Sequence, residues 1–182
     1  ALFWPDPVVS FRALKTLNKT RAYHELSYAE ESFLPVLMQW ARQYYELLAL
    51  RAVVPAVRSR AWKLLDKVAG ERQLWTIEKI FRTLDLFLPK GEAYLSYLAF
   101  QDRTFVRDNA IELIEFRLKG QIRQVVLPIF TVKDQKELLK IGRRFFGLPD
   151  GAEAVLAKGL DQEDPVARAA VLAVIGEERI VG

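Results

Sequence analysis

Apolar residues recur along almost the whole chain at spacings of three and four, the spacing of one face of an α-helix. Glycine, proline and aspartate interrupt this pattern at short intervals and mark the segment ends. Gly70 is expected to end the third segment, and Pro35 either kinks the second segment or marks its true start. The pattern predicts helices over 6–20, 26–52, 54–69, 71–86, 91–100, 102–118, 121–130, 134–146, 151–160 and 165–178.

One stretch has the composition of a β-strand. Residues 125–130 read VVLPIF, a run rich in β-branched and aromatic side chains. Pro128 excludes a central strand, because proline donates no ladder hydrogen bond. The stretch is equally compatible with a buried helical turn. The expected fold class is therefore all-α.

A twelve-residue motif is repeated near the two ends of the chain. DPVVSFRALKTL at 6–17 recurs in outline as DPVARAAVLAVI at 164–175, and VRDNAIELI at 106–114 has the same order. Aspartate is suited to cap a helix and proline to occupy its first turn. The aliphatic residues that follow form a face that packs against a neighbour. The signature residues are Asp6, Arg107, Asp164 and Arg168, with Ser10 at the arginine position of the first copy.

This motif resembles the second helix of a HEAT or armadillo-type repeat. The resemblance implies that the arginine packs along a neighbouring loop and pairs with the aspartate. It also implies an irregular right-handed α-solenoid of HEAT-like helix pairs. About four to five pairs would make residues 1–182 one domain. Five residues precede the first signature, so we expect the chain to be an excerpt of a longer protein.

A second resemblance concerns IEKIFRTLDLFLP at 77–89, GEAYLSYLAFQDRTFVRDNAIELIEF at 91–116 and DPVARAAVLAVIG at 164–176. These stretches are similar to HEAT-repeat regions fused to bacterial ADP/ATP-translocase-like, major-facilitator-type membrane proteins. The resemblance implies a soluble regulatory or docking domain, cytoplasmic or tethered to the inner membrane through a parent protein. No transport residue is carried over, because the transport machinery lies outside these stretches.

Charge is distributed unevenly around a formal net charge of +4. Residues 42–90 hold ten basic and five acidic side chains, whereas 149–182 hold three basic and seven acidic ones. The basic excess predicts a face that contacts an acidic protein, an acidic lipid surface or nucleic acid. A solvated helical surface is the alternative. The candidate partner-binding residues are Arg51, Arg58, Arg60, Lys63, Lys67 and Arg72.

Recognisable catalytic chemistry is absent from the sequence. The chain has no cysteine and one histidine, His24, and its scattered glycines form no phosphate-binding loop. No catalytic, cofactor-binding or metal-binding residue is assigned. The expected function is a non-enzymatic scaffold for protein–protein interaction.

One enzymatic alternative remains. Some HEAT-like proteins are alkylpurine-type DNA glycosylases, which hold DNA on a basic face with tryptophans and one aspartate. Trp62 and Asp66 are four residues apart and so share a helix face, with basic residues on either side. Packing of Trp62 in the core is the other reading of the same position.

Overall fold

The computed structural model describes residues 7–24, 26, 28–89, 91–101 and 106–178. These residues form nine α-helices and one short 3-10 helix, and contain no strand. The all-α prediction is confirmed at this level. The elements are α1 (Pro7–His24), η1 (Glu30–Ser32), α2 (Leu34–Ala52), α3 (Arg60–Leu84), α4 (Glu92–Gln101), α5 (Val106–Arg117), α6 (Gly120–Thr131), α7 (Gln135–Phe146), α8 (Ala152–Gly159) and α9 (Pro165–Glu178).

Local capping signals explain several helix ends. The Asp134 carboxylate accepts a hydrogen bond from the Lys136 amide at 2.9 Å and so starts α7. Gly147 ends that helix in the left-handed conformation, with φ of 62°, which costs glycine little. Helix α2 begins at Leu34, so Pro35 occupies its first turn and does not kink it.

Helix α3 is longer than predicted. The segments 54–69 and 71–86 were expected to be separate, but α3 runs unbroken from Arg60 to Leu84. The prediction that a helix ends at Gly70 was wrong. Ala69 and Gln73 on either side are buried against other helices, and this packing outweighs the cost of about 1 kcal/mol for glycine inside a helix.

The strand-like stretch VVLPIF is helical. It belongs to α6, where Pro128 lies in the last turn. The strand alternative is therefore wrong, and the reading as a buried helical turn holds. The buried residues follow the helical spacing, and they are Ile122, Val125, Val126, Ile129 and Phe130.

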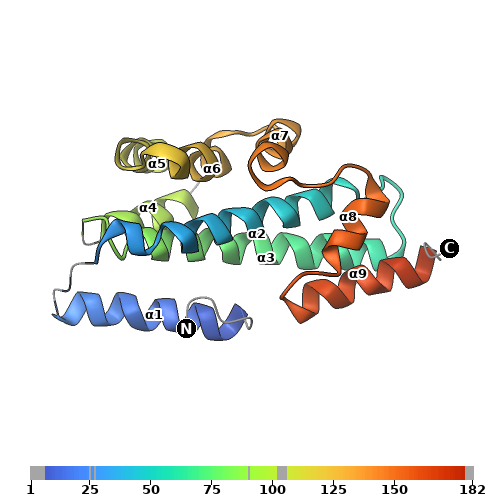
Figure 1. The fold of residues 1–182 in the computed structure, drawn as a ribbon, viewed down its shortest axis with the longest axis horizontal. Helices are drawn as coiled ribbons and strands as arrows, with labels where there is room; N and C mark the ends of the chain where they lie inside the picture. Colours follow the sequence, from blue (N-terminus) through green and yellow to red (C-terminus); the bar gives the residue numbers. More distant parts are fainter. Residues whose placement is uncertain (1–6, 25, 27, 90, 102–105, 179–182) are drawn as a thin grey trace.

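Helices α2 and α3 form a central antiparallel pair around which the other helices except α5 pack (Figure 1). Helix α3 also contacts α1, α4 and α9, whereas α2 also contacts α6, α7 and α8. Helices α4 to α7 lie on one side of the pair, and α1 and α9 lie end to end on the other. Packing around one pair does not confirm the linear stack expected of a solenoid.

All nine α-helices contribute to one hydrophobic cluster. Its largest fully buried side chains include Tyr45 of α2 and Phe81 and Leu65 of α3. The Tyr45 hydroxyl donates a hydrogen bond to the Val125 carbonyl at 3.0 Å and so joins α2 to α6. Among the described helices, none is both long and apolar enough to span a bilayer.

The three repeated segments lie in helices with different neighbours. Helix α1 packs on the second half of α3, where the Asn18 side chain donates to the Arg82 carbonyl at 3.0 Å. Helix α9 packs on the first half of α3, where the Glu177 carboxylate accepts from the Ala61 amide at 2.8 Å. Helix α5, the third copy, packs against α4 and α6. The HEAT assignment stays a prediction.

Candidate functional site

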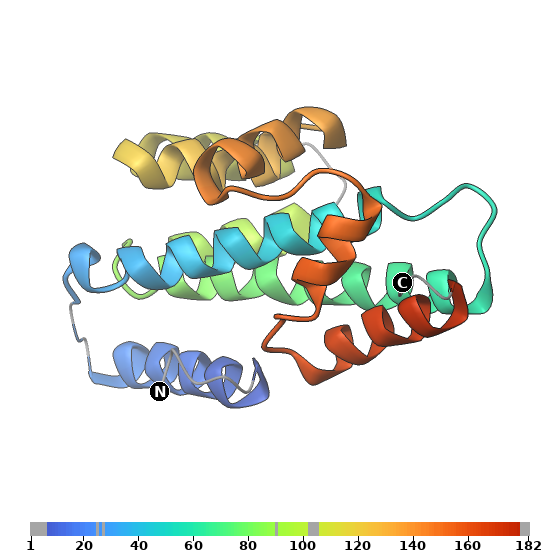
Figure 2. The same cartoon turned by 45° about the vertical axis from the view of Figure 1, so that its right-hand side comes forward.

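The six basic residues predicted to bind a partner lie on α3 and on the chain that leads into it. Arg51 is in the last turn of α2, and Arg58 is in the connection between α2 and α3. The other four residues follow along the first half of α3. Figure 2 shows that the connection swings outward at one end of the molecule, beside the end of α9.

Two of the six pair with the same carboxylate, that of Asp66. Arg51 Nε donates to its carboxylate at 3.0 Å, and Arg58 pairs with the other carboxylate oxygen. Partial burial alone would raise the pKa of Asp66, but the hydrogen bonds and charges of the two arginines outweigh it and lower the pKa. Arg51 and Arg58 therefore each have an ion-pair partner in the fold, but the cluster keeps one net positive charge and the Arg58 side chain is 42% exposed.

Arg72 is neutralised by Asp164, the residue directly before α9. Its guanidinium pairs with the Asp164 carboxylate, which is almost completely buried, and lies over the Trp75 ring. Asp164 also accepts a hydrogen bond from the Val166 amide at 2.9 Å. One carboxylate thus starts α9 and fixes it to α3.

The Asp164–Arg72 pair differs from the arrangement that the HEAT resemblance implies. Arg168 was expected to pair with the aspartate, but its side chain is exposed and forms no ion pair with a described residue. Asp6 and the side chain of Arg107 lie outside the described part of the structure, so two of the four signature residues stay predictions.

Arg60, Lys63 and Lys67 form no ion pair with any described residue. All three are exposed on one face of α3. Leu64 and Leu74 on the same face are 47% and 65% exposed, although leucine side chains are usually buried. We call this surface the α3 stripe, and its residues are Arg60, Lys63, Leu64, Lys67, Glu71 and Leu74.

Trp62 and Asp66, the pair considered for a DNA glycosylase, are both engaged within the fold. The Trp62 ring is 5% exposed, and its Nε1 donates to Glu178 at 2.8 Å. Asp66 already binds two arginines. His24 is exposed at the end of α1. The described residues contain no cluster of metal-binding side chains.

A line of buried polar side chains along α3 was not predicted from the sequence. Arg72, Thr76, Lys79 and Thr83 follow one another at helical spacing, and the last three are at most 2% exposed. This spacing in the sequence was the available signal. Thr83 accepts a hydrogen bond from Trp40 Nε1 at 3.2 Å, which ties the line to α2.

Lys79 is the unusual member of this line. Its ammonium lies 4.4 Å from the centre of the Trp40 ring, a cation–π contact. Burial lowers its pKa to about 8, although the charges of Asp164 and Glu163 act in the opposite direction; Arg72 adds to the decrease. A charged group is thus held inside the packed interface of α2, α3 and α9.

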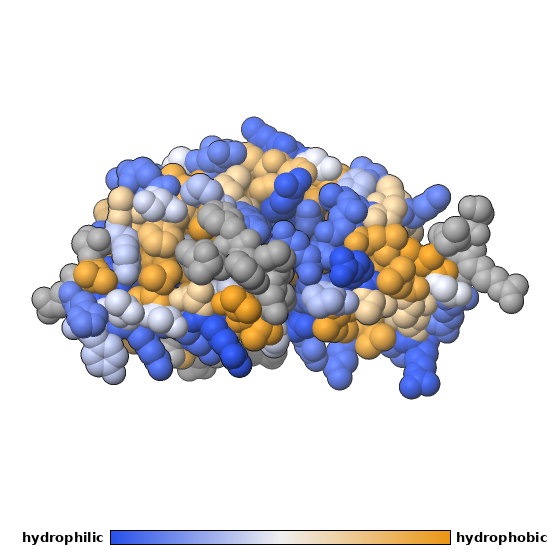
Figure 3. Space-filling view, turned by 60° about the horizontal axis from the view of Figure 1, so that its bottom comes forward, coloured by the Kyte–Doolittle hydropathy of each residue, from blue (hydrophilic) through white to orange (hydrophobic). Residues whose placement is uncertain are grey.

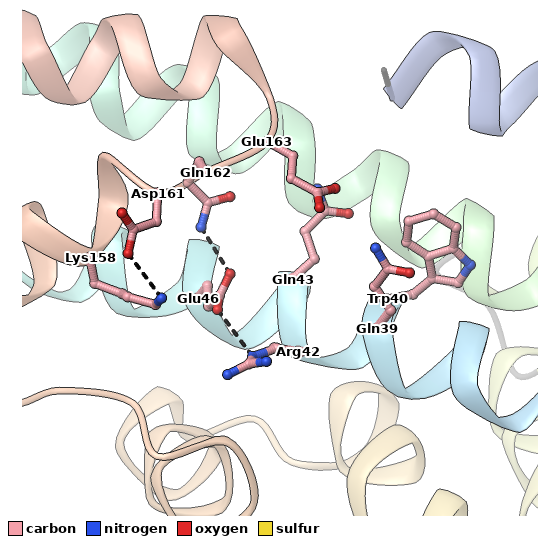
Figure 4. A pocket seen from close by; sticks show the side chains of 9 residues that line it. All are labelled: Gln39, Trp40, Arg42, Gln43, Glu46, Lys158, Asp161, Gln162 and Glu163. Carbon is pink, nitrogen blue, oxygen red and sulfur yellow. Dashed lines mark hydrogen bonds and ion pairs between the residues drawn. The ribbon is translucent and has the colours of Figure 1, made fainter. Parts of the chain in front are cut away.

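A polar pocket of about 230 Å³ opens beside this line, between α2 and the α8–α9 connection (Figure 4). Three glutamines line it from both sides: Gln39 and Gln43 from α2, and Gln162 from the connection. Gln162 donates to Glu46 at 2.9 Å across the pocket floor. The pocket was not predicted from the sequence, because its lining residues, 39–46 and 158–163, are far apart in the chain.

Comparison with protein families, with curated proteins and with solved structures finds no match for this chain. No family assignment therefore supports or excludes the HEAT resemblance.

Proposed function

We propose that this protein is a non-enzymatic helical scaffold that binds an acidic amphipathic segment of a protein partner through the α3 stripe. The observation that carries the proposal is the difference among the six predicted cations. Arg51 and Arg58 share the one carboxylate of Asp66 and Arg72 pairs with the buried Asp164, whereas Arg60, Lys63 and Lys67 are exposed without an ion-pair partner among the described residues.

The leucines in the stripe favour a protein partner. Leu64 and Leu74 present aliphatic surface between and beside the cations. A phosphate backbone offers no apolar complement to that surface, but an amphipathic helix with glutamates and leucines offers both. Glu71 at one side of the stripe disfavours a partner that is acidic throughout. A HEAT-type scaffold remains compatible with this role, and the antiparallel α2–α3 pair is consistent with a helix-pair unit.

A synthetic helical peptide with glutamate and leucine at helical spacing provides the test. We expect its binding, measured by fluorescence anisotropy, to weaken steeply between low and physiological salt. Reversal of the stripe charges, with Arg60→Glu, Lys63→Glu and Lys67→Glu together, should weaken binding by about tenfold or more. Mixed-sequence duplex DNA is the competing probe.

A matched control changes the same net charge elsewhere. Lys119→Glu, Lys133→Glu and Lys136→Glu replace three exposed lysines outside α3, so this variant should bind the peptide within about twofold of wild type. Equal losses in the two variants, or no loss in the stripe variant, would contradict the proposal. Binding of DNA but not of the peptide would favour the nucleic-acid alternative.

A further inference from the structure

The polar pocket is separate from the α3 stripe and has an internally balanced charge. Arg42 Nε lies 3.3 Å from a carboxylate oxygen of Glu46, and Lys158 Nζ lies 3.1 Å from one of Asp161. Figure 4 shows both pairs inside the lining. The two cations of the lining are therefore already compensated by carboxylates of the same lining.

Glu163 is the remaining charge of the lining, and Lys79 balances it. Glu163 forms no ion pair with a described residue, but its charge acts on the buried ammonium of Lys79. With both included, the pocket and its wall carry three positive and three negative side chains. Such a site presents dipoles and hydrogen-bonding groups without a net charge.

Hydrogen-bonding capacity is left over in this lining. The Oε1 atom of Gln39 is buried and accepts no hydrogen bond from a described residue. Gln43 Oε1 accepts at most a long hydrogen bond of 3.5 Å from Thr76, and its amide nitrogen donates none to the described residues. Amides and carboxylates are planar groups that can bond two adjacent hydroxyls.

Side chains on two sides of the pocket are buried and held by contacts within the fold. Trp40, its aromatic residue, is 4% exposed and is held by the Thr83 hydroxyl and by the Lys79 ammonium. On the other side, Gln162 is 5% exposed and is held by Glu46. Polar groups fixed in this way lose little freedom when a ligand binds.

We propose that this pocket binds a small neutral polyol, the size of a monosaccharide or a cyclitol. A volume of about 230 Å³ is below the roughly 300–1,000 Å³ that is typical of pockets for drug-sized ligands, so the site suits a smaller molecule. Compensated charges disfavour anions and cations equally. Planar amides and carboxylates in the lining suit a ring that carries adjacent hydroxyls on its edge.

The test titrates the full chain with glucose, galactose, mannose, N-acetylglucosamine and myo-inositol, and with spermidine and citrate as charged comparators. Binding is measured by calorimetry and by ligand-observed NMR. At least one neutral compound should bind saturably with a Kd of about 1 mM or tighter. Gln43→Leu should weaken that binding by about tenfold or more, because the amide is removed while the side-chain size is kept.

Two further variants make the result decisive. Glu163→Gln removes the charge but keeps a planar polar group, so a neutral ligand should lose less than about threefold, whereas a cationic one should lose far more. Gln124→Leu changes an exposed glutamine of α6 and should leave binding unchanged.

The proposal is overturned if no neutral polyol binds up to about 10 mM, tenfold above the expected Kd. It is also overturned if Gln43→Leu, checked to be folded by circular dichroism, binds normally, or if a charged comparator binds more tightly. The α3 stripe variants leave the pocket intact, so either proposal can fail alone.

Discussion

Lys79 is a lysine that the fold buries, and its charge opposes folding. It is 2% exposed, and burial is the main reason that its pKa falls to about 8. In the unfolded chain a lysine titrates near 10.5. Between these values the unfolded state binds more protons than the folded state, so the contribution of Lys79 to stability rises with pH from about 8 to 10.5.

Replacing Lys79 with methionine should therefore stabilise the protein below pH 8. The expected gain in the free energy of unfolding is about 3 kcal/mol, and it should shrink toward zero as the pH rises to 10.5. The charged neighbours Asp164, Glu163 and Arg72 keep their charges over this range, so the trend belongs to Lys79. Urea denaturation of both proteins at intervals from pH 7 to 10.5 measures it.

An exposed lysine on the same helix gives the comparison. Lys67→Met should change the free energy of unfolding by less than about 0.5 kcal/mol at every pH, because that side chain is solvated. If the difference between Lys79→Met and wild type stayed constant with pH, the ammonium would not be desolvated as the structure indicates.

The sequence was enough to select the candidate residues, but it did not show which ion pairs they form. The six candidate cations were identified from local composition, and Trp62 was correctly weighed as a core residue. Asp66 is close in the chain to Arg51 and Arg58, but no local pattern connects Asp164 with Arg72 across 92 residues. Exposure of the α3 stripe depended on the same long-range packing.

Among the elements, helix ends with a local cause were predictable and those with a tertiary cause were not. Asp134 and Gly147 define α7 through their own backbone geometry. Gly70 carries the same local signal, but the packing on both sides keeps α3 helical. At Gly142 and Gly159 the absent side chain serves packing, because an added Cβ would lie 2.8 Å from Leu148 and 2.9 Å from Leu50, respectively. Sequence alone does not separate these uses of glycine.

The Arg72–Asp164 pair is one of the polar links between α9 and α3, beside those of Glu177 and Glu178. Arg72→Met should destabilise the protein by about 3 kcal/mol, because it leaves the Asp164 carboxylate buried without its partner. Hydrogen exchange should show the loss of protection first in α9. The double variant with Asp164→Asn should be more stable than Arg72→Met alone, since asparagine keeps the capping oxygen and removes the charge. If the loss of stability in the double variant equalled the sum of the losses in Arg72→Met and Asp164→Asn, the two charges would not interact.

The whole molecule is arranged around one helix pair, and this determines how a local defect should spread. In a linear array each unit contacts its two neighbours, so a defect loosens one end. Here α2 and α3 together contact all of the other α-helices except α5, which packs on α4 and α6. A defect in α3 should therefore be felt by the helices on both sides.

Leu65 tests this arrangement because it is fully buried in α3. Leu65→Ala should lower the free energy of unfolding by about 2–5 kcal/mol, through lost apolar contacts and the cavity left behind. Hydrogen exchange should then accelerate by a similar factor in α1, α2, α6 and α9, because their protected amides open through the same global unfolding. Leu64→Ala, one residue away and half exposed, should cost less than about 0.5 kcal/mol. Faster exchange confined to α3 and one flanking helix would instead show that the chain unfolds as an array of nearly independent units, and would support the solenoid that the repeated motif predicted.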